Sequence, residues 1–274
     1  MKKIALILAL IMVAGSVNGQ KLVILHTNDS HSQIEPVRTG RNANKGGVDR
    51  RLQFIDSVKH KYGEKKVLVL DAGDYNQGTP YFTMGGGKLE VDLMNALGYE
   101  VVTLGNHEFD NGQQDLANRL AKAKYETICC NYDFSQTPLK DIIKPYTIVN
   151  RGGFKIGLVG ATSYLEGVVM YSHLDGMKRL DSVSEVNKWA EYLKNTEKCD
   201  IVILLSHFGY DGGTIDKPSD KLYGENSRNV DFIIGGHSHT FIKEPLVVKN
   251  LDGKDVVIVT AGCQGVEVGE LKIW

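Results

Sequence analysis

A chain of 274 residues with 42% hydrophobic and 24% charged residues has the composition of a globular protein with one large hydrophobic core. Its 32 basic and 33 acidic residues leave a net charge of −1. This balance lacks the basic footprint of a protein that binds a nucleic-acid polymer, so we expect no such partner.

Residues 1–19 are predicted to be a secretory signal peptide. Two lysines precede an apolar run from Ile4 to Val13, which is too short to span a membrane. Val17 and Gly19 suit the positions before a cleavage site, which would leave Gln20 first. No cysteine follows the apolar run and no later stretch could span a bilayer, so we expect no membrane anchor. The sequence therefore predicts an exported protein, periplasmic or secreted.

Six short runs rich in Val, Ile and Leu, without clean polar alternation, predict strands that are buried on both faces. Polar or glycine-rich residues follow each run. In chain order the six stretches are KLVILHTNDSH (21–31), KKVLVLDAGD (65–74), YEVVTLGNHEFD (99–110), CDIVILLSHFG (199–209), DFIIGGHSHT (231–240) and DVVIVTAGCQG (255–265).

Helical patterns separate the early strands. Apolar residues at 48, 52, 55 and 58 predict a helix that ends at Gly63, and a second pattern ends at Gly98. Further helical patterns cover 110–124 and 182–195. Alternating strands and helices indicate an α/β fold with right-handed crossovers.

Two β-hairpins are predicted later in the chain. One covers residues 144–162 and turns at a Gly-Gly pair, and the other covers 245–261 and turns at Asp252-Gly253. Since the chain has no low-complexity linker and no internal repeat, one folded domain is expected.

The four cysteines lack the spacing of a zinc knuckle. Buried thiols are the preferred interpretation, because Cys is among the most buried residue types. A bridge between Cys199 and Cys263, or between the adjacent Cys129 and Cys130, is the alternative in an exported protein.

The polar clusters at the strand ends predict a metal site. Open α/β sheets bind ligands at the carboxyl ends of their strands, and five of the eight histidines lie at such ends. Mixed oxygen and nitrogen donors suit Mn²⁺, Zn²⁺ or Fe²⁺, and the donors are too numerous for one ion. Two ions about 3.5–4 Å apart that share one carboxylate would use them all.

Each cluster also has a structural interpretation when it is taken alone. Asp29 could cap a turn, Asp71 and Asp74 could form one, and a single His207 is more often structural than a ligand. The recurrence at successive strand ends favours the metal interpretation. Asn28 begins a glycosylation sequon, but a glycan beside a metal ligand is not expected.

The order D-x-H, G-D, G-N-H-E, single His, G-H-x-H resembles the calcineurin-like metallophosphoesterase superfamily. The stretches ILHTNDSH, DAGDYNQG, MNALGYEVVTLGNHEFD and IIGGHSHT resemble the N-terminal catalytic domain of the 5′-nucleotidase and UDP-sugar hydrolase family. The resemblance covers Leu22 to the end. It implies a four-layer α-β-β-α sandwich with mixed sheets. The expected organisation is a signal peptide (1–19) and a catalytic domain (20–274), without the family's C-terminal nucleotide-binding domain.

The resemblance also implies two metal ions and a catalytic pair. Both proposed ligand sets include Asp74, which would bridge the ions. The first set is Asp29, His31, Asp74 and His239, and the second is Asp74, Asn106, His207 and His237. His107 and Asp110 match the catalytic pair, with Asp110 orienting His107 and favouring its charged form. Asp71 would orient ligands, and Glu108 receives no role.

An exported dinuclear phosphatase is the function that this resemblance implies. It would hydrolyse phosphate monoesters of nucleotides through attack by a metal-activated hydroxide. A 2′,3′-cyclic-nucleotide phosphodiesterase with 3′-nucleotidase activity and a UDP-sugar hydrolase are the enzymatic alternatives. A metal-binding subunit that acts through a partner is the non-enzymatic one. A separately encoded C-terminal domain is the macromolecular partner to be considered.

Overall fold

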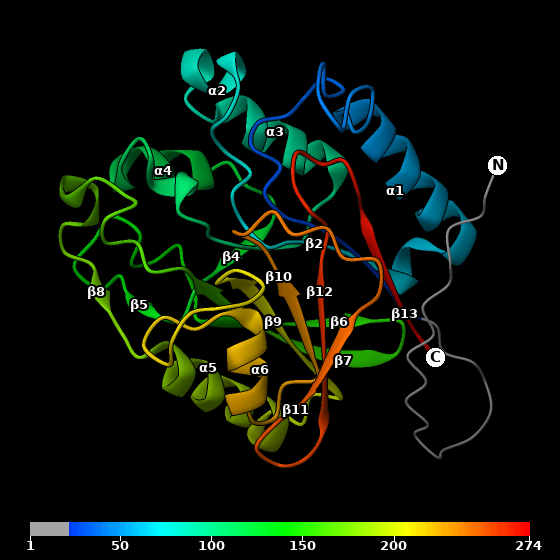
Figure 1. Ribbon diagram of the computed structural model, residues 1–274, viewed down its shortest axis with the longest axis vertical. Coiled ribbons are helices and arrows are strands. Elements are labelled where there is room, and N and C mark those ends of the chain that lie inside the picture. Colours follow the sequence, from blue (N-terminus) through cyan, green and yellow to red (C-terminus); the bar gives the residue numbers. More distant parts are fainter. Residues whose placement is uncertain (1–21) are drawn as a thin grey trace.

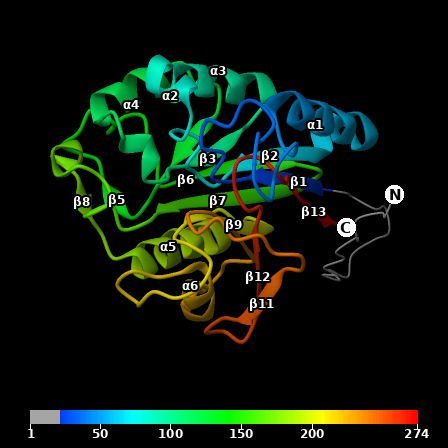
Figure 2. The same cartoon turned by 45° about the horizontal axis from the view of Figure 1, so that its top comes forward.

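Two β-sheets packed face to face form the centre of the computed structural model, which describes residues 22–274 (Figure 1). The predicted signal peptide lies outside the described residues. Helices cover the outer face of each sheet, which gives four layers in the order α-β-β-α (Figure 2). This arrangement confirms the α/β sandwich with mixed sheets that the resemblance implies.

The first sheet has five strands in the order β13-β1-β2-β3-β4. Strands β1 to β4 run parallel to one another. Strand β13 forms one edge of the sheet and pairs antiparallel with β1. Their bounds are β1 (Leu22–Thr27), β2 (Val67–Asp71), β3 (Val101–Thr103), β4 (Glu126–Ile128) and β13 (Gly269–Ile273).

The second sheet has six strands in the order β11-β12-β10-β9-β7-β6. The four inner strands are parallel, and both predicted hairpins supply an antiparallel edge strand. The bounds are β6 (Tyr146–Arg151), β7 (Phe154–Thr162), β9 (Ile201–His207), β10 (Phe232–Gly235), β11 (Leu246–Lys249) and β12 (Asp255–Thr260). A small separate sheet pairs β5 (Tyr132–Asp133) with β8 (Lys178–Arg179).

Within the described residues, four helices cover the first sheet and two cover the second (Figure 2). The first group is α1 (Val48–Tyr62), α2 (Pro80–Gly85), α3 (Lys88–Leu97) and α4 (Gln113–Leu120), and the second is α5 (Ser182–Glu191) and α6 (Asp220–Asn226). Short helical turns are η1 (Glu64–Lys66), η2 (His107–Phe109), η3 (Tyr171–Leu174) and η4 (Tyr192–Thr196). The helix predicted over 110–124 is shorter than expected, because Gly112 precedes its first turn and Ala121 ends it.

Alternate residues of each inner strand face different layers of the core. In β1, Leu22 and Ile24 pack between the sheets, whereas Val23 and Leu25 pack against the helices. All six residues of β1 are buried. The continuous apolar runs in the sequence therefore reflect burial on both faces, as predicted.

The contact between the two sheets leads to a prediction at Gly160 in β7. A Cβ at this position would collide with the backbone carbonyl of Ile128 in β4. We expect Gly160→Ala to lower the free energy of unfolding by about 1–3 kcal/mol through overpacking. Gly85→Ala is the control, because a Cβ there meets nothing within 4 Å. Denaturant unfolding measures both, and equal stability of the two variants would contradict the packing.

Candidate metal centre

The predicted ligand residues converge at one edge of the two sheets. The parallel register of β1 and β2 pairs Thr27 with Asp71, so the segments after these strands emerge side by side. The register of β9 and β10 pairs Ser206 with Gly235 and brings their following segments together in the same way. These segments and the β3–η2 loop surround a cavity of about 640 Å³. Its lining includes His31, Asp74, Asn106, His107, His237 and His239.

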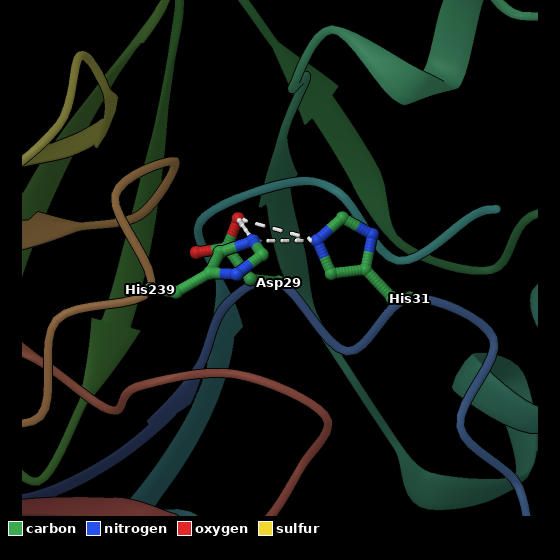
Figure 3. Close-up of side chains that lie close together, drawn as sticks. All are labelled: Asp29, His31 and His239. Carbon is green, nitrogen blue, oxygen red and sulfur yellow. Dashed lines mark hydrogen bonds and ion pairs between the residues drawn. The ribbon is translucent and has the colours of Figure 1, made fainter. Parts of the chain in front are cut away.

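The first side-chain group contains Asp29, His31 and His239, which each offer a ligand atom within 4.8 Å of the others. Figure 3 shows the two imidazole rings with nitrogens facing each other beside the carboxylate of Asp29. The two Nε2 atoms are 2.8 Å apart. Nε2 of His31 and of His239 lie 3.8 and 3.6 Å from Asp29 Oδ1.

The second group contains Asp74, His207 and His237, again with ligand atoms within 4.8 Å of one another. His207 Nε2 is 3.0 Å from Asp74 Oδ2, while its Nδ1 lies 2.7 Å from the carbonyl oxygen of Ala72. That second contact fixes the ring orientation, as partners of metal-binding histidines do. Asp74 also lies within 4.8 Å of ligand atoms of His31 and His107. This carboxylate therefore lies between the two groups.

Burial and charge set the protonation of the cluster. Burial lowers the pKa of His31 and of His237 to about 4, so both rings are neutral near pH 7. Burial also opposes a charge on His207, but Asp74 and Asp29 override it and raise its pKa to about 10. Burial raises the pKa of Asp74, but the interaction with His207 outweighs this effect and brings the pKa below its ordinary value. The centre thus stabilises positive charge between two carboxylates.

The donor chemistry fits a divalent cation. Asp29 and Asp74 are 0% and 2% exposed, and two carboxylates so close together are costly without a cation. Asn106 Oδ1 is buried and has no hydrogen-bond partner among the described residues. An unpaired oxygen beside neutral imidazoles and carboxylates is the mixed donor set that Mn²⁺, Zn²⁺ or Fe²⁺ accepts.

Several of these residues have strained backbones. Five non-glycine residues of the cluster have positive φ, namely Asp29 (50°), His31 (45°), Asp74 (56°), His237 (73°) and His239 (54°). Such conformations cost on the order of 1–3 kcal/mol each and concentrate at functional sites. Cross-segment hydrogen bonds hold them, because the backbone N–H groups of Asp29 and His31 donate to the carbonyls of Gly73 and Asp74.

Glu108 is the main site residue that the sequence analysis left without a role. Its carboxylate is fully buried and accepts the backbone N–H groups of Asp74, Tyr75, Asn76 and Gly105 at 2.9, 3.1, 3.3 and 2.6 Å. Burial, reinforced by Asp74, raises the pKa of Glu108 to about 7. Glu108 therefore joins the turn after β2 to the turn after β3. The only signal in the sequence was its position next to His107.

Two further residues orient the turns. Asp71 Oδ1 accepts the N–H of Gly73 at 2.9 Å, and Oδ2 accepts the hydroxyl of Thr27 at 2.6 Å, so Asp71 shapes the turn that carries Asp74. Asn28 is 1% exposed and donates from Nδ2 to Asp29 Oδ2 at 2.7 Å. Its burial keeps the side-chain amide of the sequon away from solvent.

His107 is the first residue of η2 and lines the cavity, and Asp110 directly follows this helical turn. His107 Nδ1 is 2.9 Å from Asp110 Oδ2, and the backbone N–H of His107 donates to Asp74 Oδ1 at 2.9 Å. The hydrogen bond to Asp110 raises the pKa of His107, which favours the charged ring. The Nε2 edge remains available to a molecule in the cavity.

The cysteines form no disulfide in the described structure. All four are free thiols, and Cys129, Cys130 and Cys199 are buried, as the preferred interpretation predicts. Cys263 is partly exposed and lines the cavity.

Comparisons with known proteins agree with this geometry. Residues 22–241 match the Calcineurin-like phosphoesterase family. The chain is 34% identical to the 5′-nucleotidase of Homo sapiens, over 92% of this chain and 46% of that protein. It is also 34% identical to a snake venom 5′-nucleotidase of Gloydius brevicauda, over 97% of this chain and 46% of that protein. The chain spans about half the length of the curated relatives it matches.

Solved structures of nucleotidases also resemble this chain. A 5′-nucleotidase precursor from Thermus thermophilus superposes with a TM-score of 0.79 at 32% identity, over 93% of this chain and 51% of that chain. The NAD nucleotidase of Haemophilus influenzae superposes with a TM-score of 0.80 at 30% identity, over 92% and 47% of the two chains. Among residues 22–274, no helix is long and apolar enough to cross a membrane.

The Glu108 contacts predict a large effect of an isosteric change. Glu108→Gln keeps the shape but places an NH₂ group against backbone N–H donors. We expect it to lower the free energy of unfolding by about 1–3 kcal/mol, since buried donors lose their acceptor. Glu191→Gln on the exposed face of α5 is the control. Chemical denaturation gives both values, and a Glu108→Gln protein as stable as the control would refute this role.

Proposed function

Since the chain belongs to the calcineurin-like phosphoesterase family, we propose that it is a 5′-nucleotidase-like phosphatase that hydrolyses phosphate monoesters with two divalent cations. The observation that carries this proposal is the position of Asp74 between two groups of ligand side chains. Turnover of an aryl phosphate with added Mn²⁺ tests the activity. A chain that binds metal without turnover would instead be a subunit that works through a partner.

Seven side chains would hold the cations. One cation would use Asp29, His31, Asp74 and His239, and the other would use Asp74, Asn106, His207 and His237. The two side-chain groups support this division, because each already has its ligand atoms within 4.8 Å of one another. Two divalent cations in such a site supply positive charge for phosphoryl oxygens and make water a stronger nucleophile at neutral pH.

His107 and Asp110 would act on the phosphoryl group. Asp110 holds Nδ1 of the ring, so Nε2–H is the free donor of the imidazolium. From the cavity wall this donor can stabilise negative charge on a phosphoryl oxygen and on the departing alkoxide. The contact of the His107 N–H with Asp74 Oδ1 fixes the distance between the donor and the ligands.

The nucleotide substrate is supported by the names of the relatives. Several carry the name 5′-nucleotidase, which favours nucleotide monoesters over the cyclic-phosphodiester and UDP-sugar alternatives. Because the chain spans about half of these proteins, we propose that base and ribose contacts come largely from a C-terminal domain outside residues 20–274. Export to the periplasm or the medium is also proposed, supported by the signal-like N-terminus and by a relative from venom.

We expect the metal-loaded protein to bind two divalent cations per chain. Elemental analysis of metal-loaded protein should find two ions, and one or none would refute the site. Asp74→Ala should lose both ions, because its carboxylate is shared, whereas His31→Ala should mainly weaken one. Asp92→Ala, at an exposed position of α3, serves as the control and should keep both.

His107→Ala separates catalysis from metal binding. Because His107 is outside both ligand sets, the variant should keep both cations. Its kcat should fall by about 10²–10⁴, the usual contribution of a positioned acid. The exposed His60 on α1 offers a matched His→Ala control. Loss of metal, or full turnover, would show that His107 has another role.

The isolated chain should hydrolyse small phosphoesters but show a high KM for nucleotides. The cations and His107 act on the phosphoryl group whatever the leaving group is, whereas remote contacts determine substrate binding. The measurement is kcat/KM for a nucleoside monophosphate and for an aryl phosphate. A strong preference for the nucleotide would mean that residues 20–274 contain their own base-binding site.

A further inference from the structure

A second cavity of about 160 Å³ lies beside the metal centre and shares one wall with it. His237 lines both cavities. The other lining residues come from the end of β7 and the residues after it, from β8, from the start of α5, from the segment between β4 and β5, and from the loop between β9 and α6. The side cavity and the cavity of the metal centre therefore meet at His237.

Two residues in the lining of this side cavity carry buried hydroxyl groups. Thr162 and Ser163 are 0% and 5% exposed, and within residues 22–274 neither hydroxyl oxygen has a hydrogen-bond partner. Burying a hydroxyl without a hydrogen-bond partner is destabilising. In native proteins such groups are rare, and a bound ligand is one explanation for them.

Two positively charged side chains, Arg179 and Lys217, line the same cavity and lie over the ring of Tyr164. Arg179 Cζ lies 4.8 Å and Lys217 Nζ lies 3.6 Å from the ring centroid of Tyr164. Arg179 Nη1 also pairs with Asp216 Oδ1 at 3.0 Å. Among the described residues, Asp216 is the one carboxylate in the lining, so the charged lining residues carry a net charge of +1.

We propose that this side cavity is a subsite for an anionic group on the leaving group of the substrate. The hydroxyls of Thr162 and Ser163 and the ammonium of Lys217 would donate to its oxyanion. Substrates of this class are phosphate monoesters whose leaving group carries a second phosphate or a carboxylate. The inference rests on the proposed function, since it assumes that the phosphoryl group lies at the metal centre.

Matched aryl esters test the subsite. Phenyl phosphate has no second anion, whereas 4-carboxyphenyl phosphate and 1,4-phenylene bisphosphate carry a carboxylate and a phosphate on the same ring. The readout is the selectivity ratio, the kcat/KM of an anionic ester divided by that of phenyl phosphate. We expect Lys217→Met and Ser163→Ala each to lower this ratio about five- to tenfold, since hydrogen bonds to charged groups are among the stronger ones.

Lys249→Met is the control, because it removes the same charge from an exposed position of β11, outside the lining of both cavities. Its ratio should match the wild type. The carboxylate and phosphate esters show which oxyanion the cavity prefers. A selectivity ratio that stays at the wild-type value in both Lys217→Met and Ser163→Ala would overturn the proposal.

If the proposed function were wrong, the experiment would give a result different from an unchanged selectivity ratio. In that case the metal-loaded wild type would hydrolyse none of the esters. Calorimetric titration of the same protein with phenyl phosphate and with 1,4-phenylene bisphosphate would still examine the subsite. Tighter binding of the bisphosphate that Lys217→Met abolishes would support the subsite, and equal affinities would refute it.

Discussion

The proximity of two buried carboxylates, Asp29 and Asp74, is the constraint on which the rest of the site depends. Both residues are at most 2% exposed, and repulsion between the two carboxylates opposes their ionisation. Imidazole rings surround the pair. His207, whose pKa is raised, contacts Asp74 at 3.0 Å, and the rings of His31 and His239 lie beside Asp29. The geometry therefore favours concentrated positive charge at two adjacent points, and divalent cations supply it more completely than protons do.

Backbone hydrogen bonds make this arrangement rigid. Asp29 occupies a left-handed turn and accepts the N–H of His237, which itself follows a strand of the other sheet. Glu108 ties the turn after β2 to the turn after β3 through four backbone donors. Because the donors and acceptors belong to different segments, no turn can relax alone. The strain of the positive φ angles is thus offset by contacts between segments, which preorganises the ligand set.

Much of the fold and of the site could be predicted from the sequence, because strand ends in a parallel sheet share one edge. Apolar runs indicated the buried strands, and the polar residues after them indicated the clustered side chains. The left-handed turns at Asp29 and Asp74 could not be predicted, because positive φ is uncommon for any non-glycine residue and no local pattern distinguishes these two from the other aspartates. The role of Glu108 was missed because its hydrogen-bond partners are mostly backbone groups of a distant segment. The side cavity joins Ser163 to Lys217 through tertiary packing that no local pattern encodes.

The proposed site requires that one carboxylate, Asp74, be shared by the two cations. Electron paramagnetic resonance of the protein loaded with two equivalents of Mn²⁺ examines this sharing, because the spectrum reports the coupling between the ions as well as their number. Two ions sharing Asp74 should give an exchange-coupled signal that is replaced by uncoupled Mn²⁺ in Asp74→Ala. The spectrum of isolated Mn²⁺ in the wild type at full loading would contradict the shared carboxylate and the site built on it.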